Sequence, residues 1–383
     1  MLFENLFNIV LGFLAAYYAL VILALIVGIR RLQHSCFAGK PFVSVIVAAR
    51  NEEANMQGLL DCLAHQDYPE YEIIVVNDRS TDRTLAIIEQ FQQQNTKIRR
   101  IDIVSPSPDM PSKKHALAQG VAASKGEILI FTDADCLPPA TWLTTMIQGF
   151  EKNVGLVAGY SPYSLTQKSA TQKLSLLTSL FLKFIRYEEF KGATWSAGAI
   201  GLKRGWLCTG RSLAYRRAVY DEVGGFEDIR HSISGDDDLF LQLVRRQTTW
   251  QMRYVTSPGS YVPTWAPLTF REFVEQRTRH FSAGKYFSIP MKLFFFLFHF
   301  ANLVILLAIL GGIFLGSSVV LFLPYVVKCI MDTMLFFTAA PVFNEKRFGP
   351  LFLLMEILVI FYNSLIGPLG FLKTFQWKPE AHL

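Results

Sequence analysis

Cysteine is sparse in this chain of 383 residues, and its five copies show no metal-ligand spacing. An odd number of cysteines spaced in this way describes neither a disulfide framework nor a zinc site. In a cytoplasmic domain, thiols stay reduced. We therefore predict free thiols at all five positions, which are Cys36, Cys62, Cys136, Cys208 and Cys329.

The sequence also lacks a run of arginine and lysine with interleaved aromatic residues, which would indicate a nucleic-acid-binding surface. Its formal net charge is nevertheless +6. Basic loops beside membrane spans, and attraction to an anionic membrane surface, account for such an excess. The charge therefore indicates a membrane lipid partner and no nucleic acid.

Charge is absent from a long apolar stretch, Leu6 to Ile29, which is long enough to cross a bilayer as a helix. A signal peptide carries basic residues before its apolar run and a small-residue cleavage site after it. Here Arg30 and Arg31 follow the run instead. Residues 1–31 are therefore predicted to form a retained N-terminal transmembrane anchor.

A second apolar region covers residues 291–372 and is interrupted twice by polar residues. The interruptions delimit three candidate transmembrane helices, at about 291–315, 318–341 and 349–371, and a tail follows at 373–383. Positively charged residues concentrate in cytoplasmic loops. The basic pairs at 30–31 and 346–347 thus place the middle domain, residues 41–285, on the cytoplasmic side of the inner membrane, with the 316–318 turn outside.

Three charged residues interrupt these C-terminal segments. Lys328 and Asp332 are one helical turn apart, and Glu356 lies in the next segment. Unpaired charges are costly in lipid. We therefore expect the three side chains to face the helix bundle and to pair.

Between residues 41 and 131 the chain alternates short apolar runs with segments of helical spacing. This alternation predicts a parallel sheet with helices on both faces. Ligands of such sheets bind outside the carboxyl ends of the strands. The predicted strands are 43–49, 72–76, 98–104 and 128–131, and the helices between them are near 54–65, 85–91 and 113–123. The polar residues that follow three of the strands are Arg50, Asn51, Glu52, Asp78, Asp133 and Asp135.

Asp133 and Asp135 stand two positions apart after the strand 128–131. Residues at i and i+2 of a strand lie on the same side, so both carboxylates can reach one point. Neighbouring carboxylates repel each other unless a cation or a proton intervenes. Mg²⁺ prefers a few carboxylates together with substrate phosphates, so a metal-bound diphosphate fits this pattern. A solvated turn that carries two aspartates is the alternative.

Four motifs resemble, in order and spacing, the nucleotide-binding half of a family-2 glycosyltransferase with a GT-A fold. They are Val-Ser-Val-Ile-Val-Ala-Ala-Arg-Asn-Glu-Glu from residue 43, Val-Asn-Asp-Arg-Ser-Thr-Asp from 76, Lys-x-x-Ala-Leu from 113 and Thr-Asp-Ala-Asp-Cys from 132. The similarity extends over about residues 41–285. It implies an α/β domain with a mixed, mostly parallel sheet, joined here to transmembrane α-helices.

The resemblance also implies roles for individual residues. Asp78 would accept a hydrogen bond from the nucleobase, commonly uracil, because an ionised carboxylate only accepts. Asp135, with Asp133, would hold Mg²⁺ or Mn²⁺ against the donor diphosphate, where the metal neutralises charge on the leaving group. Lys113 would assist near the phosphates or the sugar, and a solvated lysine at a helix start is its alternative. The strand end that packs on base and ribose comprises Ala49, Arg50, Asn51 and Glu52.

A second acidic cluster follows Gly235 and comprises Asp236, Asp237 and Asp238. The family keeps an aspartate at the second acidic position after such a glycine, which implies that Asp237 is the base that takes the acceptor hydroxyl proton. Asp236 would raise the pKa of its neighbour. We expect Asp238 to cap the following helix or to face solvent. An acidic helix start without catalytic function is the alternative.

The segment Gln276-Arg277-Thr278-Arg279-His280 resembles the Gln-x-x-Arg-Trp motif of membrane polysaccharide synthases. Arg279 keeps a donor that can stabilise the leaving diphosphate. His280 lacks the broad indole on which an acceptor sugar would stack. The substitution therefore favours single-sugar transfer over processive polymerisation. The alternative is a basic juxtamembrane helix.

An apolar segment with four basic residues, Gln167 to Phe190, is predicted to be helical. It is too charged to span a membrane, and it fits either a helix on the membrane interface or an ordinary core helix.

These observations predict a membrane-anchored, metal-dependent, inverting glycosyltransferase. It would move a sugar from a nucleotide-sugar donor, expected to be a UDP-sugar, to a lipid-linked or glycan acceptor at the cytoplasmic membrane face. A processive polysaccharide synthase is one alternative. A catalytically silent membrane scaffold that binds nucleotide-sugar is the other, although four acids around one site, Asp78, Asp133, Asp135 and Asp237, argue against it.

Overall fold

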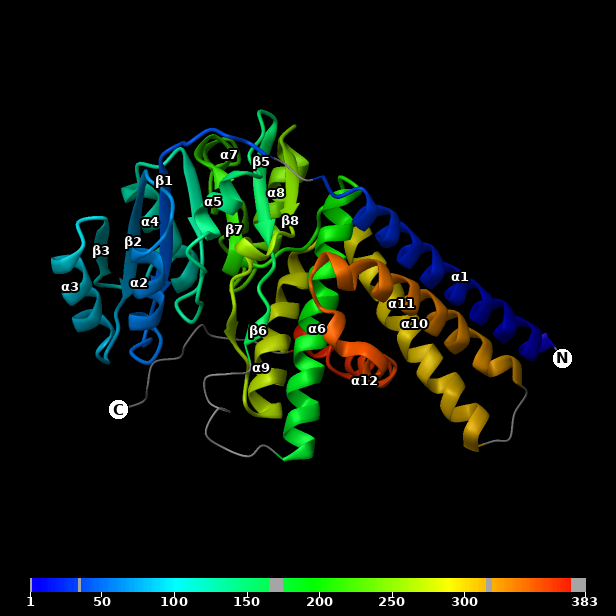
Figure 1. Cartoon of the computed structure of the whole chain (residues 1–383). Coiled ribbons are helices and arrows are strands. Elements are labelled where there is room, and N and C mark those ends of the chain that lie inside the picture. Colours follow the sequence, from blue (N-terminus) through cyan, green and yellow to red (C-terminus); the bar gives the residue numbers. More distant parts are fainter. Residues whose placement is uncertain (1, 34–35, 165–174, 315–318, 373–383) are drawn as a thin grey trace.

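A seven-stranded sheet forms one half of the molecule, and long helices form the other half (Figure 1). The computed structural model describes residues 2–33, 36–164, 175–314 and 319–372. The strand order is β3-β2-β1-β4-β7-β5-β8. The strands are β1 (Val43–Ala49), β2 (Tyr71–Asp78), β3 (Ile98–Ile103), β4 (Ile128–Phe131), β5 (Val154–Gly159), β7 (Leu213–Arg216) and β8 (Gln251–Val255).

The sheet is mixed and mostly parallel, as predicted. Strands β1 to β4 run parallel to one another, and β5 is parallel to β8. Strand β7 alone in this sheet, as far as the structure describes it, runs antiparallel to its neighbours β4 and β5. Two short strands, β6 (Tyr163–Ser164) and β9 (Thr264–Trp265), form a separate parallel pair.

Helices cover both faces of the sheet because alternate residues of its central strand point to opposite sides. Val45 and Val47 of β1 pack with α2 (Met56–Ala64), α3 (Thr84–Gln94) and α5 (Trp142–Ile147). Ile46 and Ala48 pack on the other side, with α4 (Ser112–Ala123) and α8 (Asp238–Gln247). A short helix, α7 (Arg217–Glu222), follows β7.

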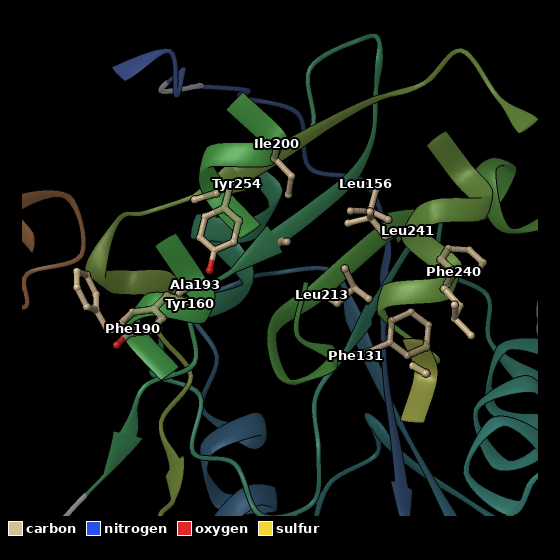
Figure 2. Close-up of a cluster of buried hydrophobic side chains, with 14 of the residues drawn as sticks. Phe131, Leu156, Tyr160, Phe190, Ala193, Ile200, Leu213, Phe240, Leu241 and Tyr254 are labelled. Carbon is tan, nitrogen blue, oxygen red and sulfur yellow. The ribbon is translucent and has the colours of Figure 1, made fainter. Parts of the chain in front are cut away.

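Helix α6 (Leu176–Gly201) connects the two halves of the molecule. Figure 2 shows its Phe190, Ala193 and Ile200 in one apolar cluster with side chains of the sheet and of α8. Most of the helix from Leu182 onward is buried, whereas Leu176 and Leu177 at its start are exposed. The predicted helix at 167–190 therefore exists as a largely buried helix that continues to residue 201, and its 165–174 part lies outside the described residues.

Three helices of the described chain are long and apolar enough to cross a membrane, judged by length and composition. They are Leu6–Arg30 within α1 (Leu2–Arg30), α10 (Ile289–Phe314) and α11 (Leu323–Val342). The segment predicted as a further span, 349–371, instead holds α12 (Phe352–Leu365) and the short α13 (Leu369–Leu372).

Helix α12 has 14 residues, and at 1.5 Å per residue it is about 21 Å long, short of a hydrocarbon core of about 30 Å.

The domain limits 1–31, 41–285 and 291–372 stay predictions. The predicted outer turn at 316–318 and the tail at 373–383 lie outside the described residues.

The charged residues of the C-terminal helices pair inside the protein, as expected. Lys328 contacts Asp332 on the same helix and lies 3.2 Å from Glu356 of α12. Lys191 of α6 lies 2.8 Å from Glu356. Tyr18 of α1 donates a hydrogen bond of 2.8 Å to Asp332. We call these side chains the ion cluster. It joins four helices, and each of its charges has a partner of opposite charge, which avoids the cost of an unpaired charge in lipid.

Glycines bring the backbones of α1 and α6 into direct contact. A Cβ atom built on Gly28 would lie 1.9 Å from the carbonyl oxygen of Gly198, and one on Gly201 would lie 2.1 Å from that of Gly28. Small residues allow this close approach of helices in membranes. Helix α1 therefore packs directly against α6, the helix that also packs on the sheet.

The substitution Gly28→Ala should destabilise the protein although alanine favours helix over glycine. Its methyl group has no space unless the two helices separate, and overpacking of this kind costs about 1–3 kcal/mol. Thermal unfolding in detergent measures the effect. Gly12→Ala on the same helix is the matched control because a Cβ there meets nothing within 4 Å. Equal unfolding temperatures for the two variants would contradict the close contact.

Candidate functional site

The predicted site residues come together at one edge of the sheet. Strands β2, β1 and β4 are neighbours and parallel, so their carboxyl ends meet. Asp78 is the last residue of β2, Arg50 follows β1, and Asp133 and Asp135 follow β4. The topology thus brings together polar groups that are far apart in the sequence.

Asp78 is buried between two guanidinium groups. Arg79 donates a hydrogen bond of 2.8 Å from its Nε atom to Oδ1 of Asp78. The Nη1 atom of Arg50 lies 3.8 Å from Oδ2. Both guanidinium groups present hydrogen-bond donors to the oxygens of this carboxyl group, which can accept them.

The residues after β1 hold the loop after β2. Asn51 accepts a hydrogen bond of 2.8 Å from the backbone N–H of Thr81, and the backbone N–H of Glu52 donates one of 2.7 Å to Thr84. Asn51 and Arg79 both have positive φ angles, of 52° and 54°. Such backbone conformations in non-glycine residues are uncommon and gather at functional sites. Asn51 and Glu52 thus brace the edge near Asp78, and Ala49 is the buried last residue of β1.

Lys113, at the start of α4, joins the two acidic clusters. Its Nζ atom lies 3.0 Å from Oδ1 of Asp133 and 2.9 Å from Oδ2 of Asp236. Burial would lower the pKa of this ammonium, but Asp133, Asp236 and Asp237 raise it well above the usual value. The group therefore stays protonated. Because it contacts both carboxylates, the alternative of a solvated lysine at a helix start does not apply.

Asp133 and Asp135 supply only part of the coordination that a metal ion bound to a diphosphate needs. Burial and the charge of Asp133 raise the pKa of Asp135, so a cation here would be stabilised. Within the described residues, no group of three or more His, Cys, Asp or Glu side chains could hold a metal ion. Two carboxylates suit Mg²⁺ when substrate phosphates complete the coordination. The pair fits a divalent ion in that setting.

Asp237 has the properties of a general base. It precedes α8, and its carboxylate accepts hydrogen bonds from the backbone N–H groups of Gly210, at 2.9 Å, and Asp238, at 2.7 Å. Burial and the neighbouring charge of Asp236 raise the pKa of Asp237 to about 6. Burial acts in the same direction on Asp236, but Lys113 and Lys114 outweigh it and lower the pKa of Asp236. The two neighbours are thus separated into an ionised group and a more basic one.

The remaining acidic residue, Asp238, does not cap the helix or face solvent as predicted. Asp237 occupies the N-cap position of α8, and Asp238 instead accepts a hydrogen bond of 2.7 Å from the backbone N–H of Cys208. Lys114, which the sequence did not single out, is fully buried and donates a hydrogen bond of 2.8 Å to the carbonyl oxygen of Ser234. It thereby holds the loop that leads into the acidic cluster.

A cavity of about 660 Å³ opens beside Asp237 and continues toward the helical half. Glu188 and Glu189 of α6 line it together with two buried arginines, Arg211 and Arg277. Arg211 pairs with Glu189, and Arg277 pairs with both glutamates. Sequence reasoning missed all four residues. The available signal was the pair of adjacent glutamates, Glu188 and Glu189, in an apolar-rich helix.

Helix α9 (Phe270–Phe281) carries the predicted motif from residue 276 to 280. Gln276 accepts a hydrogen bond of 2.9 Å from the hydroxyl of Tyr163. His280 lines the cavity, and Arg279 is half-buried on the same helix. The buried arginine of this segment is Arg277, which lies between the two predicted motif positions.

Comparisons with known proteins support one family. Residues 44–224 match the family model of glycosyl transferase family 2. A probable glycosyltransferase of Bacillus subtilis (strain 168), YdaM, is 26% identical over 264 residues, which are 67% of this chain and 58% of the relative. A beta-monoglucosyldiacylglycerol synthase of Nostoc sp. (strain PCC 7120 / SAG 25.82 / UTEX 2576) is 28% identical over 56% of this chain and 43% of the relative. The chain thus spans about half the length of these relatives.

Among solved structures, the mannosyltransferase PcManGT from Pyrobaculum calidifontis, in complex with GDP-Man and Mn²⁺, has a similar fold. Its TM-score is 0.56 at 20% sequence identity, over 88% of this chain and 98% of that chain. The similarity extends beyond the segment matched by the family model into the helical half.

The substitution Lys113→Met should lower stability by about 2 kcal/mol, because Asp133 and Asp236 lose the charged hydrogen-bond donor that they share. Thermal unfolding in detergent measures the loss. Lys152→Met, at an exposed position, is the control and should have no effect. If both variants unfold at the temperature of the wild type, Lys113 does not hold the two acidic clusters together.

Proposed function

We propose that this chain, which carries a family 2 glycosyltransferase domain with the GT-A fold, transfers a sugar from a nucleotide-sugar with inversion at the anomeric carbon. The donor is expected to be a UDP-sugar, and the acceptor a lipid-linked or glycan hydroxyl. The domain would work at the cytoplasmic face of the inner membrane, to which the three candidate spans attach it. The observation that carries the proposal is the contact of Lys113 with both Asp133 and Asp236.

The donor side of the site comprises Asp78 and the residues after β4. The carboxyl oxygens of Asp78 are hydrogen-bond acceptors that suit an imide N–H of a nucleobase. Asp133 and Asp135 would hold Mg²⁺ or Mn²⁺, which would neutralise charge on the leaving nucleoside diphosphate. The mannosyltransferase of similar fold is described with GDP-Man and Mn²⁺, which agrees with a donor site of this kind.

The acceptor side of the site centres on Asp237. Its carboxylate takes the proton of the acceptor hydroxyl as the acceptor oxygen forms a bond to the anomeric carbon. The bond from that carbon to the diphosphate oxygen breaks, and its electron pair leaves with the nucleoside diphosphate. Asp236 forms an ion pair with Lys113 and stays ionised. Its negative charge helps to raise the pKa of Asp237, so that Asp237 can accept the proton.

Calorimetric binding of UDP and GDP to the detergent-solubilised protein, with and without Mn²⁺, tests the donor side. Metal-dependent binding of UDP supports the proposal, and preferential binding of GDP would change the donor class. Asp135→Ala should weaken UDP binding and abolish turnover because it removes one of two metal-binding carboxylates. Unchanged affinity and turnover in this variant would exclude the metal role. A chain that binds UDP but releases no product from any donor would be the silent scaffold.

The pKa of Asp237 predicts how activity depends on pH. Since this pKa is raised to about 6, the carboxylate is protonated below that pH and cannot accept the hydroxyl proton. The kcat/KM of sugar transfer should therefore fall about tenfold per unit as the pH decreases below about 6, and level off above it.

Asp237→Asn should abolish transfer and retain UDP binding, whereas Asp61→Asn, at an exposed position, should change neither. Transfer that persists in Asp237→Asn with the same pH profile would exclude Asp237 as the base. Long polymeric products from the wild-type enzyme would favour the processive synthase.

A further inference from the structure

The cavity beside Asp237 reaches from the acidic cluster to the surface of a candidate membrane span. At one end it is lined by Asp237 and Thr209, and at the other by Phe296, Phe300 and Leu303 of α10. The side chains of Phe296 and Phe300 are 59% and 38% exposed. Because α10 is apolar and long enough to cross a bilayer, these phenylalanines lie where lipid chains would surround the helix. The cavity therefore connects lipid with the group that takes the hydroxyl proton.

The size and lining of the cavity suit an amphiphile. A volume of about 660 Å³ lies in the range of pockets that enclose most of a drug-sized ligand. The lining between α6, α10 and α12 is mainly aromatic and aliphatic, with Phe295, Phe298, Val359 and Tyr362 among its members. Polar groups concentrate at the end near Asp237. A molecule with a small polar head and apolar chains matches this distribution.

Three cations that line the cavity are paired with carboxylates within the protein. Arg211 and Arg277 pair with Glu189, and Arg277 also pairs with Glu188. Lys191 pairs with Glu356 and lies 3.5 Å from Asp332. These cations are therefore committed before any ligand enters.

A phosphate group would find little compensation at the inner end of the cavity. Asp237 and Asp238 lie there, and a second anion beside them would be repelled. Lys292, an exposed residue near the start of α10, also lines the cavity.

We propose that this cavity takes an acceptor lipid whose head group bears a free hydroxyl and no phosphate, and that the lipid enters beside α10. This assignment rests on the proposed function and specifies its acceptor. The chains lie along Phe296, Phe300 and Leu303, and the hydroxyl is presented to Asp237. The buried Arg–Glu pairs offer the head group hydrogen-bonding partners without net charge.

Lipid binding can be separated from catalysis by a photolabelling experiment. The full-length protein is placed in phosphatidylcholine nanodiscs with a photoreactive diacylglycerol, and labelling is measured without donor. Unlabelled diacylglycerol should compete with the probe, and undecaprenyl phosphate should not. Peptide mapping should locate the label on α6, α10 or α12. Stronger competition by undecaprenyl phosphate, or label confined to other segments, would overturn the proposal.

A glycine in the wall of the cavity allows a specific block. Gly192 of α6 lines the cavity, and a Cβ built on it meets nothing within 4 Å, so Gly192→Leu would project into the free volume. This variant should reduce labelling about tenfold or more. Gly311→Leu, on α10 beyond the lining residues and also in open space, is the matched control and should label like the wild type. Equal labelling of both variants would refute the assignment.

Nucleotide binding distinguishes the failure of this inference from that of the proposed function. Metal-dependent UDP binding without diacylglycerol labelling would reject the lipid acceptor and leave the transferase standing. Diacylglycerol labelling without nucleotide binding would reject the transferase on which the assignment rests. UDP binding in Gly192→Leu also shows that this variant is folded.

Discussion

The ammonium group of Lys113 is the contact on which the arrangement of the site depends. It lies between a carboxylate that follows β4 and another that precedes α8, and these segments are about a hundred residues apart in the sequence. Without a cation the two carboxylates would repel each other and the loops that carry them would separate. The cation keeps Asp236 ionised, and burial together with the charge of Asp236 raises the pKa of Asp237 although Lys113 acts to lower it. One side chain thereby joins the two acidic segments and keeps Asp236 ionised.

Helix α6 joins the sheet to the apolar helices, as Lys113 joins the two acidic segments. Its apolar residues share a core with the sheet (Figure 2), its glycines contact α1, and Lys191 reaches the ion cluster. The same helix contributes Glu188 and Glu189 to the cavity. The sheet and the apolar helices are therefore not independent units joined by a linker. The long apolar helices and the acidic cluster share one continuous packed interior, which explains how a cavity can extend from one to the other.

The sequence alone predicted the parts of the site that follow local patterns. Buried strands such as Val43–Ala49 are short apolar runs, and parallel topology requires that residues after them, such as Asp78 and Asp133, share an edge. The antiparallel β7 was not predicted, because Leu213–Arg216 is only four residues long and its pairing is decided by neighbours distant in sequence. The importance of Arg211 and Arg277 was also missed. A buried arginine is recognisable only when its partner glutamates are known, and those lie on another helix.

The ion cluster has a consequence for biosynthesis. During translation α11 emerges before α12, and its Lys328 and Asp332 can neutralise each other at once because they are one turn apart. Glu356 arrives later and needs Lys328 together with Lys191, which belongs to a helix anchored on the sheet. Correct packing of α12 thus depends on prior folding of the half of the molecule that contains the sheet. A nascent chain whose sheet has misfolded would present a solitary carboxylate in an apolar helix, a feature by which membrane quality control could recognise it.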